Sequence, residues 1–229
     1  MSAVKIVAII PALDEEASIG SVVAAIPRTL VSEVLVVNNG STDRTAEAAA
    51  AAGARVVTEP ERGYGAACRR GLEAAAGADI LVYLDGDASD QPGELASILD
   101  PVVRGEADLV IGSRLLGRRE AGAMPPHAVL GNWLAARLVR LLYGVRITDL
   151  GSFRAIPRSA LLALGMRERT YGWPVEMIVK AARQGYRIRE VPVTHRKRIG
   201  RSKVAGTLAG SLKAAYFIFF TTLRYAFRL

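Results

Sequence analysis

The chain has 229 residues, 51% of them hydrophobic and 23% charged, which is enough for one large α/β domain or two small ones with a sizeable core. A single cysteine, Cys68, excludes an internal disulfide framework and fits a reducing compartment, and no segment reaches the roughly 18 uncharged apolar residues of a spanning helix. The net charge of +8 is uneven: residues 1–110 carry 8 Lys or Arg against 17 Asp or Glu, whereas residues 111–229 carry 22 against 5.

Strand-like and helix-like segments alternate through the first 112 residues. Short apolar runs predict strands at residues 5–10, 33–37, 54–58, 80–84 and 108–112. Helical spacing of apolar or alanine residues predicts helices at residues 18–26, 42–52 and 63–76, the second capped by Ser41 or Thr42. This alternation indicates βαβ units, and so an α/β, Rossmann-like fold with a mostly parallel central sheet flanked by helices.

Two carboxylates, Asp85 and Asp87, follow the apolar run at residues 80–84. In open α/β sheets, ligands bind just beyond the carboxyl ends of the strands. Two hard oxygen donors on one short turn suit Mg²⁺ or Mn²⁺ shared with the phosphates of a substrate. Taken alone, Asp-x-Asp around a glycine also fits an ordinary turn. The metal hypothesis therefore depends on what the neighbouring loops carry.

The loops after the first two predicted strands are also polar. Asp14 and Glu15 follow the first strand, and Asn38, Asn39 and Asp43 follow the second. Because parallel strands end at one edge of a sheet, these groups and Asp85 are expected to converge there. Neither G-x-G-x-x-G nor a P-loop follows the first strand, and a nucleotide would therefore be held differently from one in a dinucleotide-binding domain.

The second half of the chain supplies mostly cations. Arg114 follows the strand at 108–112, where a guanidinium beside the metal loop would neutralise a diphosphate. A loop at 115–126, a helix at 128–143, a polar cluster at 148–154 and a strand at 186–194 follow. Glu176 lies in the first turn of another helix, where it either complements the helix N-terminus or has a functional role.

Two basic segments close the chain. Residues 195–203 hold five Lys or Arg and one His, and their Gly200 and Ser202 favour a phosphate-binding loop over a solvated loop or a nucleic-acid patch. His195 is expected to donate to phosphate rather than to bind a metal, because no second His or Cys is nearby. Residues 207–229 are aromatic and basic but too short to span a bilayer, which favours interfacial membrane binding over a dimer or core helix.

Together, these loops resemble family 2 glycosyltransferases of the dolichyl-phosphate mannose synthase type, which have a GT-A fold. The resemblance runs over essentially the whole chain. Its six motifs, in order, are PALDEE, VVNNGSTDRT, LDGDASDQP, IGSR, TDLGSFRA and EVPVTHRKRIGRSK. It implies a GT-A domain at 1–203, divided into a nucleotide-sugar and metal half (1–112) and an acceptor half (113–203), followed by a C-terminal amphipathic aromatic helix at 204–229.

The resemblance also implies a nucleotide-diphosphate sugar donor, UDP- or GDP-linked, with Mg²⁺ or Mn²⁺ as cofactor. Asp85 and Asp87 would hold the metal, with Ser89 as a further ligand. The residues implied in substrate binding are Pro11, Ala12, Asp14 and Glu15 for the nucleoside, Asn38 or Asn39 with Asp43 for base and ribose, Gly63, and Arg114, Arg198, Ser202 and Lys203 for phosphates. Asn38 stands where the family has Asp, and Asp14 where it has Asn, which leaves the base open.

The implied reaction is inverting glycosyl transfer, in which the metal and cations stabilise the leaving nucleoside diphosphate. A polyprenyl phosphate acceptor is already an anion, whereas a hydroxyl acceptor needs a general base, for which Asp149 and Glu176 are the candidates. The basic half and the aromatic tail favour the lipid acceptor and peripheral binding at the cytoplasmic membrane face. The alternatives are a nucleotidyltransferase and a non-catalytic basic adaptor; nucleic acid is not an expected partner.

Overall fold

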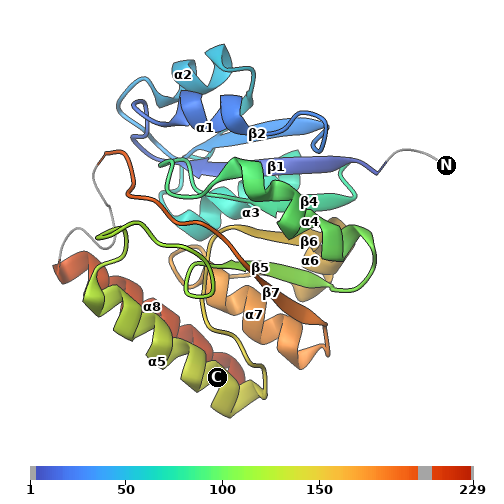
Figure 1. Ribbon diagram of the computed structural model, residues 1–229, viewed down its shortest axis with the longest axis vertical. Coiled ribbons are helices and arrows are strands. Elements are labelled where there is room, and N and C mark those ends of the chain that lie inside the picture. Colours follow the sequence, from blue (N-terminus) through green and yellow to red (C-terminus); the bar gives the residue numbers. More distant parts are fainter. Residues whose placement is uncertain (1–3, 201–207, 228–229) are drawn as a thin grey trace.

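A seven-stranded sheet forms the centre of the structure, a computed structural model that describes residues 4–200 and 208–227 (Figure 1). The strand order is β3-β2-β1-β4-β6-β5-β7. In chain order, the strands are β1 Ile6–Ala12, β2 Glu33–Asn38, β3 Arg55–Thr58, β4 Ile80–Tyr83, β5 Leu109–Ser113, β6 Arg154–Pro157 and β7 Ile188–Pro192.

Only β6 runs against its neighbours among these strands. It pairs antiparallel with both β4 and β5, and the other pairs are parallel. The carboxyl ends of β1, β2, β4 and β5 therefore lie at one edge of the sheet, together with the beginning of β6. The predicted α/β fold with a mostly parallel sheet is confirmed.

Helices cover both faces of the sheet. They are α1 Ile19–Ala25, α2 Thr45–Ala51, α3 Tyr64–Ala74, α4 Leu95–Val103, α5 Pro126–Tyr143, α6 Arg158–Leu164, α7 Trp173–Arg183 and α8 Leu208–Ala226, with a 3-10 turn at Pro92–Glu94. The buried side chains of α1, α2 and α4 form one core with the sheet, and those of α3, α5, α6 and α7 form the other. The central strands have cores on both sides, which explains their almost continuous apolar sequences.

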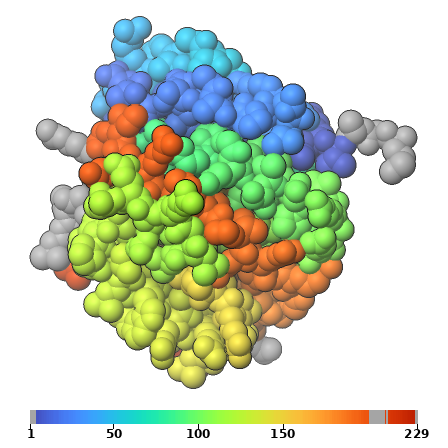
Figure 2. Space-filling model, viewed as in Figure 1, coloured from blue at the N-terminus to red at the C-terminus, as the bar shows by residue number. Residues whose placement is uncertain are grey.

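Two late segments of the chain pack against earlier parts of the fold. The helix α8 packs against α5 and α7 (Figure 1). The segment after β7 crosses the front of the molecule, where His195 forms bridges with Asp90 and Arg119 (Figure 2). Residues from the end of the chain thus lie directly against the loop that carries Asp85 and Asp87.

Two details differ from the sequence-based expectations. The first strand does not stop at Pro11 but continues to Ala12, paired with β2 alone. Its pairing with β4 ends at Ile9, so the missing N–H of Pro11 is tolerated there. Neither Ser41 nor Thr42 caps α2, so that prediction is wrong. Asp43 takes this role: its Oδ1 accepts the Thr45 N–H at 3.0 Å. A carboxylate satisfies a free N–H at a helix start as well as a hydroxyl does.

Candidate active site

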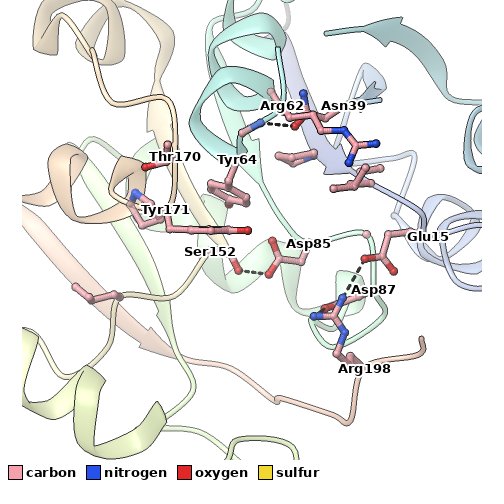
Figure 3. A pocket seen from close by; sticks show the side chains of 18 of the residues that line it. Glu15, Asn39, Arg62, Tyr64, Asp85, Asp87, Ser152, Thr170, Tyr171 and Arg198 are labelled. Atoms are coloured by element: carbon pink, nitrogen blue, oxygen red, sulfur yellow. Dashed lines mark hydrogen bonds and ion pairs between the residues drawn. The ribbon is translucent and has the colours of Figure 1, made fainter. Parts of the chain in front are cut away.

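A cavity of about 490 Å³ opens at the carboxyl ends of β1 and β4 (Figure 3). The chain winds outward from β1 to β2 and β3 on one side and continues with β4 on the other. Ligands bind in open α/β sheets at such a reversal of strand order. Pro11 and Ala12 line the cavity from β1, Glu15 from the loop after it, and Asp85 and Asp87 from the loop after β4.

Three carboxylates crowd the loop after β4. Asp90 Oδ2 accepts the backbone N–H of Asp85 at 3.1 Å, and Asp87 Oδ1 accepts the backbone N–H of Ser89 at 2.9 Å. Burial, and next the charge of Asp87, raise the pKa of Asp85 to about 6. Burial and the charge of Asp85 raise the pKa of Asp90 to about 8. Burial and mutual repulsion therefore both disfavour the charged forms of Asp85 and Asp90.

This cluster fits a divalent cation that is shared with a substrate. Across residues 4–200 and 208–227, no three His, Cys, Asp or Glu side chains are grouped so that the protein alone would hold an ion. Mg²⁺ commonly takes one or two carboxylates and completes its shell with water and substrate phosphates. Asp85 and Asp87 line one cavity, and Ser89 lies beside them, 4% exposed. Their donor set suits Mg²⁺ or Mn²⁺ once a diphosphate is present.

Ser152 orients Asp85. Its hydroxyl donates to Asp85 Oδ2 at 2.7 Å and opposes the rise in the pKa of this carboxyl (Figure 3). The residue lies just before β6, whose reversed direction brings residues 149–152 to the carboxyl edge of the parallel strands. One antiparallel strand thus adds a hydroxyl to the carboxylate loop.

Arg198 bridges two loops across the mouth of the cavity. Its Nη1 lies 3.3 Å from Asp87 Oδ2, and its Nη2 donates to Glu15 Oε1 at 3.0 Å (Figure 3). The backbone N–H of Ile199 also donates to the carbonyl oxygen of Asp87 at 2.8 Å. The segment after β7 is therefore attached to the loops after β1 and β4, where its guanidinium can meet phosphate.

Arg114 is held by a fully buried carboxylate. Its Nε and Nη2 donate to the two oxygens of Asp149 at 2.7 and 2.6 Å, and its backbone N–H donates at 2.8 Å. Burial alone would raise the pKa of Asp149, but the charge and hydrogen bonds of Arg114 hold it below its ordinary value. Glu190 in turn accepts the N–H groups of Thr148 and Asp149. Asp149 is thus a positioning residue for Arg114, and its oxygens are occupied.

A second cavity, of about 650 Å³, adjoins the first. The lining residues that the two share are Asp85, Asp87, Arg114, Leu150, Tyr171, Pro174 and Arg198. The remaining walls of the second cavity come from the loop at 122–125, from α5, α7 and α8, and from Ser89, His195 and Lys197. Two substrates could therefore occupy adjoining cavities and meet at the two aspartates.

His195 lines the second cavity as a neutral ring. It is 7% exposed, and its Nδ1 has no hydrogen-bond partner among the described residues. Burial, followed by the positive charge of Arg114, lowers its pKa to about 4. A neutral imidazole offers one donor and one acceptor, so its expected role as a phosphate donor remains a prediction.

Several residues expected at the nucleoside instead hold the loops together. Asn39 lines the cavity, but its amide donates to the carbonyls of Glu59 and Glu61 and its oxygen accepts the Gly63 N–H. Three others do not line the cavity: Asn38 Oδ1 accepts the Ser41 N–H, Asp14 Oδ1 accepts the Thr42 N–H, and Asp43 caps α2. These side chains fix the shape of the rim.

Gly63 lines the first cavity for a reason of packing. A Cβ placed at Gly63 would lie 2.2 Å from the carbonyl oxygen of Arg169, and one at Gly65 would lie 2.4 Å from that of Glu168. The N–H of Ala66 donates to the Arg169 carbonyl at 2.9 Å. The two glycines thus allow the start of α3 to touch residues 168–169, which lead into Thr170 and Tyr171 at the cavity wall.

Glu176 lines neither cavity. It is fully buried, accepts the N–H groups of Arg167 and Glu168, and pairs with Lys180 at 2.7 Å and with the Tyr225 hydroxyl at 2.6 Å. It therefore anchors α8 to α7 rather than facing a substrate. Ser202 and Lys203 lie outside the described residues.

Sequence reasoning missed several groups at the site, Ser152 among them. Tyr64, Tyr171 and Lys213 line the first cavity from α3, from the turn before α7 and from α8. Asp90 lies behind Asp85. Of these, only Asp90 gave a signal in the sequence, because it lies in the same short loop as Asp85 and Asp87. The others reach the site through tertiary packing of distant segments.

Comparisons with known proteins agree on one family. The model for "Glycosyl transferase family 2" matches residues 7–165. An uncharacterized glycosyltransferase of Mycobacterium tuberculosis is 40% identical over 208 residues, covering 90% of this chain and 92% of the relative. Undecaprenyl-phosphate mannosyltransferase of Micrococcus luteus is 33% identical over 228 residues and covers 90% of each chain.

A solved structure matches the whole fold. Glucosyl-3-phosphoglycerate synthase from Mycobacterium tuberculosis, in complex with Mn²⁺, uridine diphosphate and phosphoglyceric acid, superposes with a TM-score of 0.80 at 25% identity. The match covers 98% of this chain and 79% of that chain. The α/β architecture described above is therefore GT-A-like.

Proposed function

This chain belongs to glycosyl transferase family 2, and from that membership we propose that it transfers a sugar, with inversion, from a nucleoside diphosphate to a polyprenyl phosphate. It is a nucleotide-sugar glycosyltransferase. We propose that the donor is UDP- or GDP-linked, that the acceptor is a lipid phosphate, and that the residues act as set out below. We also propose the division into a nucleotide-sugar and metal half (1–112), an acceptor half (113–203) and a C-terminal helix (204–229).

The donor occupies the first cavity. The nucleoside lies against Pro11, Ala12 and Glu15, and the diphosphate points toward Asp85 and Asp87. When bound there, Mg²⁺ or Mn²⁺ supplies a Lewis acid that stabilises the leaving diphosphate. Arg114 and Arg198 add fixed positive charge on the same side. The presence of uridine diphosphate and Mn²⁺ in the related synthase structure supports a nucleoside diphosphate donor used with a metal.

The acceptor occupies the second cavity. The observation that carries this proposal is its charge: Arg114, Lys197 and Arg198 line it, whereas Asp85 and Asp87 are the only carboxylates among its described lining residues. A phosphate acceptor needs cations to hold it and no base to activate it, because it is already an anion. The name of the undecaprenyl-phosphate relative supports the same acceptor class.

The candidate bases do not favour a hydroxyl acceptor. Asp149 is bound by Arg114 on both oxygens, and Glu176 lines neither cavity. We therefore assign neither a role in proton transfer. The reaction forms the sugar–phosphate bond as the bond to the nucleoside diphosphate breaks, and Arg114 and Arg198 would stabilise the negative charge of the leaving group together with any metal held by Asp85 and Asp87.

A hydroxyl acceptor is the second candidate, for two reasons. His195 is neutral in the second cavity with an unpartnered Nδ1 and could receive a proton. The related synthase structure also contains phosphoglyceric acid. This candidate predicts that His195→Gln abolishes transfer, whereas a polyprenyl phosphate acceptor predicts a loss of at most about tenfold from one weakened phosphate contact.

Acceptor extraction tests the proposal. The purified chain is incubated with Mn²⁺ and labelled UDP-, GDP- or dTDP-sugars, with either polyprenyl phosphate or the matched polyprenol. We expect label to enter the lipid phase with polyprenyl phosphate alone and with one nucleotide preferred. Label in polyprenol, or in a water-soluble alcohol but not in polyprenyl phosphate, would overturn the lipid phosphate assignment.

A further inference from the structure

We propose that α5 and α8 together form a docking surface for a bilayer that contains anionic lipids. The two helices lie in contact along one side of the molecule (Figure 1). The sequence indicates an interfacial role for the C-terminal residues alone; the structure adds a second helix, 65 residues away in the chain, to the same surface. No helix within the described part of the chain is long and apolar enough to cross a membrane.

The solvent-facing side of each helix is apolar, the reverse of an ordinary surface helix. On α8, the exposed large side chains recur at helical spacing: Leu212, Tyr216, Phe220, Leu223 and the adjoining Phe227. On α5, they are Leu130, Trp133, Leu134 and Leu141. Few other large apolar side chains are exposed on the described residues, and those are scattered over separate elements. Clustered exposure of this kind marks an interaction surface.

The charges on these helices point to an anionic partner. Neither helix sequence contains Asp or Glu, and the cations are Arg137 and Arg140 on α5 and Lys213 and Arg224 on α8. The Arg137 guanidinium lies 4.6 Å from the centre of the exposed Trp133 ring. Apolar aromatic side chains flanked by cations suit the boundary between acyl chains and anionic headgroups. A symmetric contact between two copies would instead place this surface, whose helices carry cations and no carboxylate, against a copy of itself.

Buried polar contacts fix α8 in place behind this surface. The Tyr225 hydroxyl donates to Glu176, and the Thr221 hydroxyl donates to Glu168 at 3.1 Å. The Tyr143 hydroxyl of α5 donates to the carbonyl of Thr222 at 2.5 Å. The apolar side of α8 therefore remains exposed while its polar groups are satisfied inside, which presents a rigid face to a partner.

The same helices line the acceptor cavity. Ala128 and Gly131 of α5 and Ile218 and Phe219 of α8 contribute to its wall. If the proposed lipid acceptor is correct, on which this step rests, a polyprenyl chain would pass from the bilayer between these helices with its phosphate at Arg114 and Arg198. Docking would then place the cavity over the membrane.

Vesicle flotation tests the surface without the acceptor. The full chain is mixed with vesicles of phosphatidylcholine alone or with about a third phosphatidylglycerol. We expect flotation with the anionic vesicles, weakened by salt, with affinity falling about fivefold for Arg140→Gln and at least about tenfold for Trp133→Glu or Phe220→Glu. Leu162→Glu, an exposed apolar site on α6, is the matched control and should bind as the parent chain does.

Two further measurements separate this inference from the proposed function. Transfer to a short, water-soluble polyprenyl phosphate should survive in Trp133→Glu and Phe220→Glu, while transfer to a long-chain acceptor in vesicles falls. Flotation without transfer to any polyprenyl phosphate would overturn the function and leave the surface standing. No flotation, or a dimer in sedimentation equilibrium that both substitutions dissociate, would overturn the membrane surface in favour of no partner or a second copy.

Discussion

The two cavities share a wall but are built differently. The first is formed by the ends of β1 and β4 and the start of α3, where side chains such as Asn39 are fully used in holding the loops. The second is formed mainly by helices and loops that lie outside the sheet, with exposed apolar and cationic groups nearby. The sheet therefore fixes the donor and metal side, and the added elements determine the acceptor side.

Replacement of Asp85 or Asp87, which line both cavities, should have the largest effect on transfer. We expect Asp85→Ala and Asp87→Ala each to lower kcat/KM for transfer at least about a thousandfold, since both the metal and the diphosphate lose their anchor. Mn²⁺ titration by calorimetry with UDP present should show the loss of binding. Asp100→Ala, at an exposed site on α4, is the control and should change neither value. Full activity in either site variant would refute the metal assignment.

Replacement of Arg114, which lines both cavities, tests whether its ion pair with Asp149 also stabilises the fold. Arg114→Ala leaves a fully buried carboxylate without its partner, and we expect the free energy of unfolding to fall by about 3–5 kcal/mol. Arg104→Ala, which breaks an exposed pair with Asp100, should cost less than about 1 kcal/mol. Urea denaturation measures both. Equal losses would show that burial of Asp149 does not control the energetics.

The stability difference between the parent chain and Arg114→Ala should depend on pH. The pKa of Asp149 is lowered in the folded chain, so the stability that the pair contributes is present above the unfolded pKa of about 4. It is lost as the pH falls through the folded pKa. The gap between parent and Arg114→Ala should therefore narrow in acid, and a gap that widened there would contradict this account.

Tyr225→Phe should weaken the attachment of α8 to α7 and so affect the second cavity more than the first. It removes a hydrogen bond to the buried Glu176 carboxylate, which we expect to cost about 2 kcal/mol of stability and to increase hydrogen exchange in α8. KM for the acceptor should rise while KM for the donor stays within twofold of the parent value, roughly the effect of 0.4 kcal/mol. Tyr216→Phe, on the exposed side of α8, is the control. A larger change in donor KM would show that the two sides are not separable.

Ser152→Ala should give the smallest effect, and on the donor side alone. The Ser152 hydroxyl orients Asp85 but is not itself a proposed metal ligand. We therefore expect Mn²⁺ affinity to fall about tenfold. The folded chain should keep its stability within about 1 kcal/mol. Ser159→Ala, at an exposed position on α6, should bind Mn²⁺ normally. Unchanged affinity in Ser152→Ala would make its contact with Asp85 incidental.

The sequence predicts the donor side far better than the acceptor side. Strand ends and their polar loops follow one another locally, so Asp85, Asp87 and Glu15 can be placed at one sheet edge from periodicity alone. The position of β6 cannot be read in this way, because its direction is determined by pairing with β4 and β5. Ser152 and Asp149 reach the site only through that pairing.

Residue type also misled where local hydrogen bonding was possible. Asp14 accepts the Thr42 N–H of a neighbouring loop, whereas Asn38 and Asp43 each accept an N–H group two or three residues further along the chain. None of the three lines the cavity. Short polar side chains make such local bonds readily, and sequence pattern does not distinguish them from ligand contacts. Glu176 was ambiguous for the same reason, and its burial against Tyr225 resolves it as an anchor.

The reversed strand β6 has a consequence for how this scaffold can be altered. Residues 114–153 leave the sheet at the end of β5 and return at the same edge to begin β6, since Ile111 pairs with Arg154. That excursion contains α5 and the loop with Asp149, while the strand order around β1 and β4 depends on none of it. We expect it to behave as a cassette: a chimera that exchanges 114–153, together with the α8 that packs on it, should acquire a different acceptor preference and retain its nucleotide preference.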